Sequence, residues 1–219
     1  MLCAILLLTA GCGSGNAGDP FVDAVRKMRP SVVLITMQVP GARKGQWDDG
    51  YATGVVVSSG SWGTDILTVA HAVEGERHLQ VIIENARRVP GRVTAKNGSL
   101  DLAMVRASGA RLLPAQVGDS AALQAGQTVG IIGYPIPDAF EEEGLGLAAS
   151  INSGRVSSFR KHALELNLPI VPGESGAPVF TDDGALVGIA ESRFDEERSI
   201  GFALPINEAK DFLRSHAHP

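Results

Sequence analysis

Three short patches of the sequence contain side chains that together could hydrolyse an acyl bond. His71 ends an apolar stretch that begins at Thr68, and Asp101 follows a turn made by Asn, Gly and Ser at positions 97–99. Ser175 lies between glycines in the segment PGESGAP, residues 172–178. A lone histidine at a strand end is more often a packed or solvated side chain, and a Gly-rich loop can be a plain β-turn. Imidazole, carboxylate and hydroxyl in this order instead indicate nucleophilic catalysis.

The residue types define the chemistry that each patch could supply. A serine hydroxyl is too weak an acid to attack an amide at neutral pH, so His71 would take its proton and later give it to the leaving amine. Asp101 would keep His71 in the required tautomer and stabilise the imidazolium. Gly173 and Gly176 permit a turn in which the N–H groups of Gly173 and Ser175 converge on the developing oxyanion. We expect activity to rise through about pH 6 to 7 as the imidazole loses its proton.

Short apolar runs, separated mostly by Gly, Pro, Asn, Asp or Ser, must position these side chains. About a dozen runs with little intervening helix predict closed antiparallel sheets, which leave no exposed strand edges. Apolar residues at helical spacing indicate a helix at Phe21–Met28, ended by Arg29 and Pro30, and another at Asn207–Ser215. Strand counting alone does not separate two barrels from a sandwich. The predicted strands are 31–37, 54–58, 65–70, 79–84, 92–95, 102–107, 128–133, 148–157, 163–168, 177–181, 185–190 and 200–204.

The patches and their surroundings resemble the chymotrypsin-like serine proteases, and within them the HtrA (DegP-like) branch. The likeness extends from about Phe21 to Leu213. The motifs that match this branch in order are PSVV (30–33), TGVVV (53–57), ILT (66–68), GRV (91–93), GDS (118–120), GQTV (126–129), IGYP (132–135), SGRVS (153–157) and GFALP (201–205).

The resemblance implies an all-β fold of two six-stranded antiparallel β-barrels with short N- and C-terminal helices. It implies a protease domain at residues 21–219 whose two halves divide near residues 110–125. The functional residues that it implies are His71, Asp101 and Ser175 for catalysis and Gly173 and Ser175 for the oxyanion hole.

The loop around Ser175 departs from that branch at two positions. Glu174 stands where the branch usually has asparagine and the wider trypsin group has an aspartate that pairs with a new N-terminus. Because a carboxylate turned toward the oxyanion site would repel the charge stabilised there, we expect Glu174 to face solvent or to pair with a Lys or Arg. Ala177 replaces the commoner glycine, and we expect its extra methyl group to be tolerated.

The resemblance also places the pocket for the residue before the scissile bond. No acid falls at the trypsin-type specificity position, so we expect a preference for apolar residues. The chain ends soon after its final helix, and we therefore expect no PDZ domain. Members of the branch often trimerise, but the residues here leave the oligomeric state open. The expected pocket residues are Pro169, Ile170, Val171, Ser192 and Phe194.

The first residues are typical of a targeting signal. The uncharged, mostly apolar residues 2–10 are too few for a transmembrane helix but suit a signal-peptide core. The following LTAGC resembles the bacterial lipoprotein cleavage box, which implies removal of residues 1–11, lipidation of Cys12 and a flexible tether at residues 12–20. We therefore expect an extra-cytoplasmic, membrane-anchored bacterial lipoprotein. A buried N-terminal strand is the alternative.

Composition argues against several other classes. A net charge of −5 without a long basic run gives no support for nucleic-acid binding. Both cysteines, Cys3 and Cys12, lie near the N-terminus, so the globular part has no disulfide or cysteine-based zinc site. His216 and His218 could bind a metal, but we expect a frayed terminus, and the sequence predicts no metal or cofactor. The acidic residues 141–143 are expected in a solvated loop.

These observations favour a serine endopeptidase that acts on unfolded or damaged extra-cytoplasmic proteins, with protein or peptide substrates as its partners. A catalytically quiet protease-fold module that binds peptides or partner proteins is the alternative from another class. An esterase-like acyl hydrolase would use the same three side chains. Comparing turnover of an unfolded protein with that of a simple ester distinguishes the peptidase from the esterase.

Overall fold

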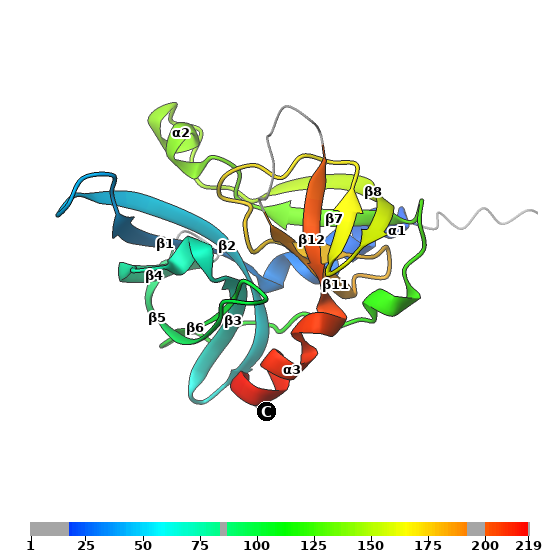
Figure 1. Ribbon diagram of the computed structural model, residues 1–219, viewed down its shortest axis with the longest axis horizontal. Helices are drawn as coiled ribbons and strands as arrows, with labels where there is room; N and C mark the ends of the chain where they lie inside the picture. Colours follow the sequence, from blue (N-terminus) through cyan, green and yellow to red (C-terminus); the bar gives the residue numbers. More distant parts are fainter. Residues whose placement is uncertain (1–17, 84–86, 192–199, 219) are drawn as a thin grey trace, which may run out of the picture.

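The chain forms two closed antiparallel β-barrels, and the computed structural model describes residues 18–83, 87–191 and 200–218. The first barrel contains β1 (Val32–Pro40), β2 (Trp47–Gly60), β3 (Gly63–Val69), β4 (Arg77–Ile83), β5 (Arg87–Asn97) and β6 (Leu102–Ala107). The second contains β7 (Thr128–Gly133), β8 (Ser150–Arg160), β9 (Ala163–Leu166), β10 (Pro178–Phe180), β11 (Leu186–Glu191) and β12 (Gly201–Pro205). They close in the orders β1-β2-β3-β6-β5-β4 and β10-β11-β12-β9-β8-β7 (Figure 1). The predicted all-β double barrel is therefore confirmed.

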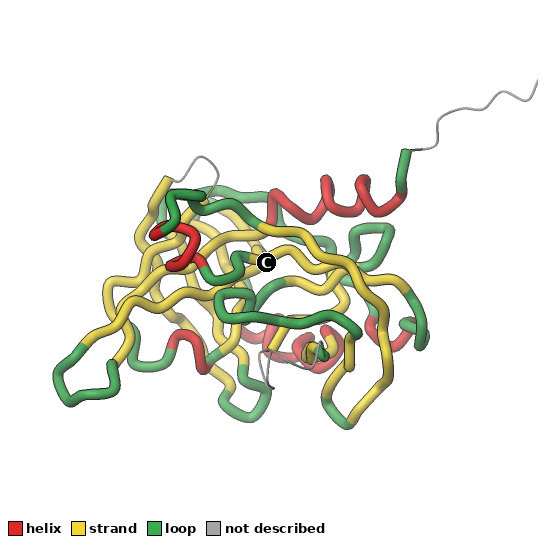
Figure 2. Tube along the Cα trace, turned by 90° about the horizontal axis from the view of Figure 1, so that it is seen from above, coloured by secondary structure: helices red, strands yellow, loops and turns green. Residues whose placement is uncertain are grey.

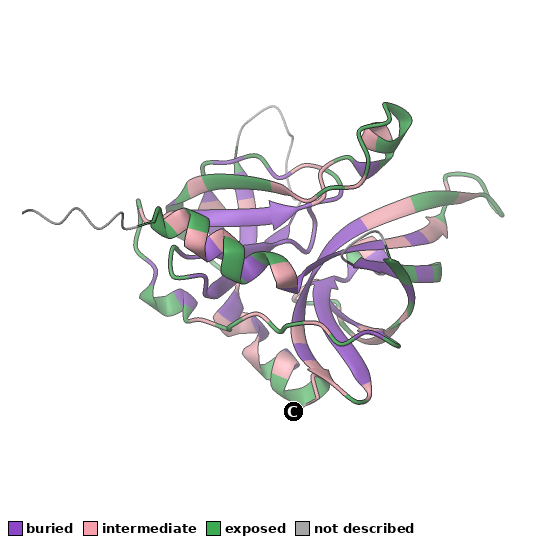
Figure 3. Ribbon diagram, turned by 180° about the vertical axis from the view of Figure 1, so that it is seen from behind, coloured by how far each residue is buried: buried purple, intermediate pink, exposed green. Residues whose placement is uncertain are grey.

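Three apolar clusters form the core of the molecule. Each barrel encloses one cluster, and the third lies between the barrels, with members from both. On β3, Ile66 belongs to the interior of the first barrel, whereas Leu67 and Val69 belong to the cluster between the barrels. Both faces of β3 are thus removed from water, and all seven of its residues are buried. Figure 3 shows that buried residues concentrate in the strands, whereas the tip of the β1–β2 hairpin is exposed.

Two helices pack at the ends of this β structure, as predicted. The first, α1 (Pro20–Met28), begins where the Asp19 carboxylate accepts a hydrogen bond from Phe21 N at 2.9 Å, and it lies along one side of the molecule (Figure 2). The last, α3 (Ile206–His216), places the buried residues Ala209 and Phe212 in the cluster between the barrels. The second barrel is thereby connected to the first through the helix that follows its final strand.

Two segments differ from the prediction. Glu141 and Glu142, which were expected in a solvated loop, lie at the end of the short helix α2 (Pro137–Glu142). This helix has too few apolar residues to show a helical pattern, but it begins with proline at its first position. β2 begins seven residues before the predicted strand, because its polar first half pairs with the end of β1, with Asp49 opposite Gln38. The segment that connects the barrels, residues 108–127, contributes no strand to either of them.

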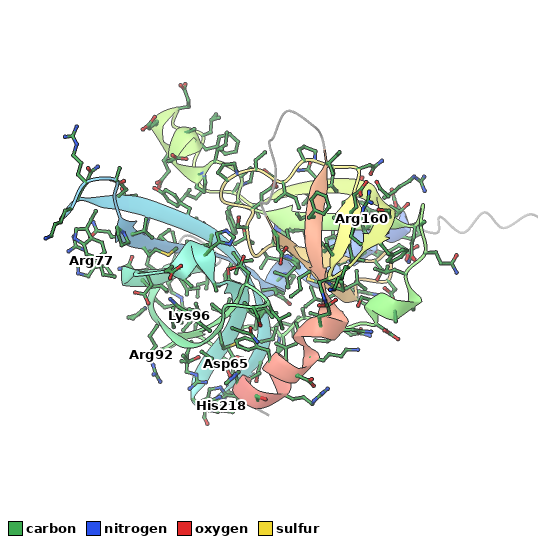
Figure 4. The ribbon with its side chains drawn as sticks, viewed as in Figure 1. Asp65, Arg77, Arg92, Lys96, Arg160 and His218 are labelled. Atoms are coloured by element: carbon green, nitrogen blue, oxygen red, sulfur yellow. The ribbon has the colours of Figure 1, made fainter. Side chains whose placement is uncertain are left out.

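The expectation of a frayed histidine terminus is wrong for His218. Its backbone N–H donates to Asp65 Oδ2 at 2.9 Å, and its ring stacks on Trp62 with centroids 5.0 Å apart. Arg106 Nη2 lies 2.7 Å from His218 Nδ1, which must accept in this contact because a guanidinium can only donate. Figure 4 shows Asp65 and His218 close together at the end of α3. The end of the chain therefore contacts the first barrel.

Asp65 is the centre of this contact. It is fully buried, and Arg106 Nε donates to its Oδ1 at 2.8 Å. Burial alone would raise the pKa of Asp65, but the hydrogen bonds from Arg106 and His218 lower it below its ordinary value of 3.8. A charged Asp65 therefore stabilises the folded state above that pH.

We predict that Asp65→Asn lowers the free energy of unfolding at pH 7 by about 3 kcal/mol, because it leaves Arg106 without a charged partner. His218→Ala, which retains the Asp65–Arg106 pair, is expected to cost about 1 kcal/mol. Urea unfolding measures both, with His216→Ala as the matched control because His216 is exposed. The Asp65→Asn deficit should shrink as the pH falls below 3.8 toward the lower pKa of Asp65. A loss of unfolding free energy that does not change with pH would contradict a stabilising role for the charge of Asp65.

Candidate functional site

His71 and Asp101 meet at one end of the first barrel. β3 ends at Val69 and leads into a short 3-10 helix that begins at His71, while Asp101 immediately precedes β6. His71 Nδ1 lies 2.5 Å from Asp101 Oδ2. The two side chains are 47% and 26% exposed, so the imidazole is open to solvent while the carboxylate is partly covered. The pair can orient the imidazole with its other nitrogen, Nε2, directed away from the carboxylate.

The backbone of Asp101 is fixed in an unusual conformation. Its φ of +51° is in the left-handed region, which non-glycine residues rarely adopt. Asp101 O accepts from Ala70 N at 2.9 Å, and Asp101 Oδ1 accepts from His71 N at 2.9 Å. The preceding turn is closed by Asn97 Oδ1, which accepts from the N–H groups of Ser99 and Leu100 at 3.1 Å. The predicted turn at residues 97–99 therefore aims the carboxylate at the segment that contains His71.

Ser175 belongs to the second barrel, but its loop is attached to the first. Thr53, on β2, donates its N–H to Ser175 O at 2.9 Å and its hydroxyl to Gly173 O at 2.7 Å. Thr68, three residues before His71, donates its hydroxyl to Thr53 O at 2.8 Å. Hydrogen bonds thus connect the Ser175 loop to β2 and, through Thr53, to β3, the strand that ends just before His71.

Gly176 allows this close approach. Its φ is +87°, and a Cβ atom there would lie 2.1 Å from Thr53 O and 2.3 Å from Thr68 Oγ1. No side chain fits into that space. The glycine after Ser175 is therefore required for contact between the barrels as well as for the turn.

The peptide groups of the loop leave two donors available. Every backbone carbonyl of residues 171–175 accepts a hydrogen bond, whereas the N–H groups of Gly173 and Ser175 have no acceptor among the described residues. Two such N–H groups on one turn could donate to a developing oxyanion. The five carbonyl bonds are Glu174 N to Val171 O at 3.0 Å, Ile136 N to Pro172 O at 2.8 Å, Thr53 Oγ1 to Gly173 O at 2.7 Å, Ala177 N to Glu174 O at 2.9 Å and Thr53 N to Ser175 O at 2.9 Å.

The expectation for Glu174 is wrong. Its side chain neither faces solvent nor pairs with a Lys or Arg, because it is 1% exposed and its Oε2 accepts from Val171 N at 3.1 Å. The other oxygen, Oε1, is buried without a hydrogen-bond partner. Burial raises the pKa of this carboxyl, and the Val171 hydrogen bond only partly opposes the shift. The loop turns the side chain inward toward β7 instead of toward solvent. Ala177 is also fully buried.

The expected pocket residues fall into different environments. Ile170 is buried in the core of the second barrel beside Gly201, Val171 is half-buried and Pro169 is exposed. Ser192 and Phe194 lie outside the described residues, as does Cys12. The acid Glu191, which ends β11 just before them, is 1% exposed and was not singled out by its sequence. Across residues 18–83, 87–191 and 200–218, no three His, Cys, Asp or Glu side chains gather as metal ligands.

Thr53 and Thr68 are the positioning residues that sequence reasoning missed. Both are fully buried, and each lies next to apolar residues of its strand. A buried polar side chain among apolar residues needs a hydrogen-bond partner. This need is the only signal in the sequence that points to a positioning role for Thr53 and Thr68. The partner across the barrels could not be identified from the pattern.

Comparison with known proteins places the chain in a family. Residues 52–189 match the family model described as trypsin-like peptidase domain. A Staphylococcus epidermidis protein named serine protease HtrA-like is 28% identical over 195 residues, covering 80% of this chain and 32% of that protein. A Halomonas elongata protein named probable periplasmic serine endoprotease DegP-like is 27% identical over 188 residues, covering 80% of this chain and 37% of that protein. The chain therefore spans about a third of the length of these curated relatives.

A solved structure supports the fold. The structure titled HtrA-type protease AlgW with tripeptide superposes with a TM-score of 0.73 at 22% identity, covering 89% of this chain and 62% of that one. At this identity the likeness concerns the fold alone.

We predict that Thr53→Val lowers the free energy of unfolding by about 2 kcal/mol, because it leaves the buried Gly173 carbonyl without its donor while preserving the side-chain shape. Thr53→Ser retains the hydroxyl and should cost less than about 1 kcal/mol. Urea unfolding of the two variants measures the difference. Equal stability of the two variants would contradict the role of the hydroxyl.

Proposed function

Because this chain belongs to the trypsin-like peptidase domain family, we propose that it is a serine endopeptidase. The observation that carries the proposal is the 2.5 Å contact between His71 Nδ1 and Asp101 Oδ2. The hydrogen bond from Thr53 N to Ser175 O, which connects the serine loop to the barrel of His71, supports it. The relatives named as serine proteases add support. Catalysis by His71, Asp101 and Ser175 is part of the proposal.

In the first step, Ser175 Oγ attacks the carbonyl carbon of the scissile peptide bond. The hydroxyl proton moves to His71 Nε2, and the negative charge of the tetrahedral intermediate develops on the former carbonyl oxygen. The N–H groups of Gly173 and Ser175 donate to this oxygen. Asp101 stabilises the imidazolium through Nδ1 and stays ionised.

The intermediate then collapses and the peptide bond breaks. His71 gives its proton to the leaving amine, and the acyl group remains on Ser175 as an ester. Water attacks this ester with His71 again as the base, which releases the second product and restores the serine. No metal or cofactor enters either step.

For the substrate class, we propose unfolded or damaged extra-cytoplasmic proteins. The relatives that support this choice include a protein named probable periplasmic serine endoprotease DegP-like. We also propose lipidation of Cys12 as the membrane attachment, with residues 12–20 as the tether, which ends where Asp19 and Pro20 begin α1. No helix within the described residues is long and apolar enough to cross a membrane.

We predict that the full chain cleaves an unfolded, carboxymethylated casein, and that Ser175→Ala lowers the rate on the order of 10⁴-fold or more. Asp101→Asn should lose about 10⁴-fold, because the imidazole then adopts the wrong tautomer. Urea unfolding verifies that each variant is folded. A folded wild-type chain that binds casein without cleaving it would instead favour the peptide-binding module, and turnover of a simple ester alone would favour the acyl hydrolase.

For the membrane attachment, we predict that Cys12→Ser moves the protein from the membrane to the soluble fraction of expressing bacteria and abolishes incorporation of labelled palmitate. Each CH₂ group of an acyl chain that enters the membrane contributes about 0.8 kcal/mol to binding, so the loss of the lipid removes this attachment. Cys3→Ser is the matched control, since Cys3 lies within the expected signal peptide, and it should leave both readouts unchanged. Retention of Cys12→Ser on the membrane would rule out attachment through this residue.

A further inference from the structure

The side chain of Glu174 closes a ring within the loop that precedes Ser175. Its backbone N–H donates to Val171 O at 3.0 Å, and its Oε2 accepts from Val171 N at 3.1 Å. One residue therefore binds both the carbonyl and the N–H of Val171. This double contact fixes the turn that contains the N–H groups of Gly173 and Ser175, neither of which has an acceptor among the described residues.

Beside Gly133, the Glu174 side chain packs with uncharged groups. A Cβ atom on Gly133 of β7 would lie 3.1 Å from Glu174 Cγ, 3.2 Å from the Ala177 methyl and 3.2 Å from Thr53 Oγ1. Burial raises the pKa of Glu174, and the hydrogen bond from the Val171 N–H opposes part of that shift.

A carboxylate would be costly in this position. Glu174 is 1% exposed, and its Oε1 has no donor within hydrogen-bond distance among the described residues. An uncompensated buried charge is far less favourable than an unpaired neutral hydroxyl, so a group in such surroundings keeps its proton. The proton belongs on Oε1, because Oε2 is the atom that accepts from Val171 N.

We propose that Glu174 is a positioning residue that holds the oxyanion loop through an uncharged carboxyl, with Oε2 bound to the Val171 N–H and the proton on Oε1. The inference rests on the proposed function, because it concerns the loop that would stabilise the oxyanion. A neutral acid next to the nucleophile adds no repulsion to the developing charge. Ionisation of Glu174 would place a buried charge beside the turn and release it.

The first experiment measures the proton on Glu174 without reference to activity. The folded state retains a proton that the unfolded chain releases above pH 4.5, the ordinary pKa of a glutamate, so wild-type stability must fall with rising pH relative to Glu174→Gln. The ratio of the two unfolding equilibrium constants should change about tenfold per pH unit between that value and the raised pKa of the folded state. Glu142→Gln, at an exposed position on α2, is the matched control and should show no such change. A ratio that is constant with pH, or that changes in the opposite direction, would overturn the proposal.

The second experiment measures the loop itself. Hydrogen exchange of the Val171 N–H should be about tenfold or more faster in Glu174→Ala than in the wild type, and Glu174→Gln, which keeps an acceptor oxygen, should restore protection. Equal protection in all three proteins would overturn the positioning role even if Glu174 is protonated.

The third experiment separates this inference from the proposed function. Cleavage of unfolded casein by the wild type should decline at high pH as Glu174 ionises, whereas Glu174→Gln should lack that decline. Identical pH profiles would contradict the inference alone. If the wild type does not cleave at all, the proposed function fails, while unfolding and hydrogen exchange still decide the state of Glu174.

Discussion

The proposed chemistry depends on the alignment of the two barrels, because the proposed base and the proposed nucleophile come from different ones. His71 and Asp101 belong to loops of the first barrel, and Ser175 to a loop of the second. A shift of about 1 Å between them would be enough to impair chemistry. Thr53 meets this constraint directly, since its N–H and its hydroxyl both donate to carbonyls of the Ser175 loop.

The rest of the fold stabilises that alignment. An apolar cluster with members from both barrels fills the interface, and α3 extends it with Ala209 and Phe212. Beyond α3, His218 binds Asp65 on β3, so the chain returns from the second barrel to the first. The two barrels are therefore joined at three places: at the Ser175 loop, in the apolar cluster and at the end of the chain. Relative motion of the barrels would have to disrupt all of them.

The sequence predicted most of the fold because its strands carry strong local signals. β3 and β11 are buried along their whole lengths and appear as apolar runs, and Asn97 marks its turn by composition. Local signals fail where a contact joins distant parts of the chain. Nothing near Glu174 in the sequence indicates the apolar pocket that buries it, and nothing near His218 indicates Asp65. The burial of Glu174 reversed the expectation of an exposed or paired acid. The hydrogen bond from His218 to the buried Asp65 reversed the expectation of a frayed terminus.

The central claim is that Ser175 is an activated nucleophile, and covalent labelling tests it most directly. The folded full chain would be treated with a fluorophosphonate and its peptides analysed by mass spectrometry. The account predicts one adduct, on the peptide that contains Ser175, formed much faster in the wild type than in a folded His71→Ala variant. Absence of an adduct on Ser175 in the folded protein, or equal labelling without His71, would contradict it.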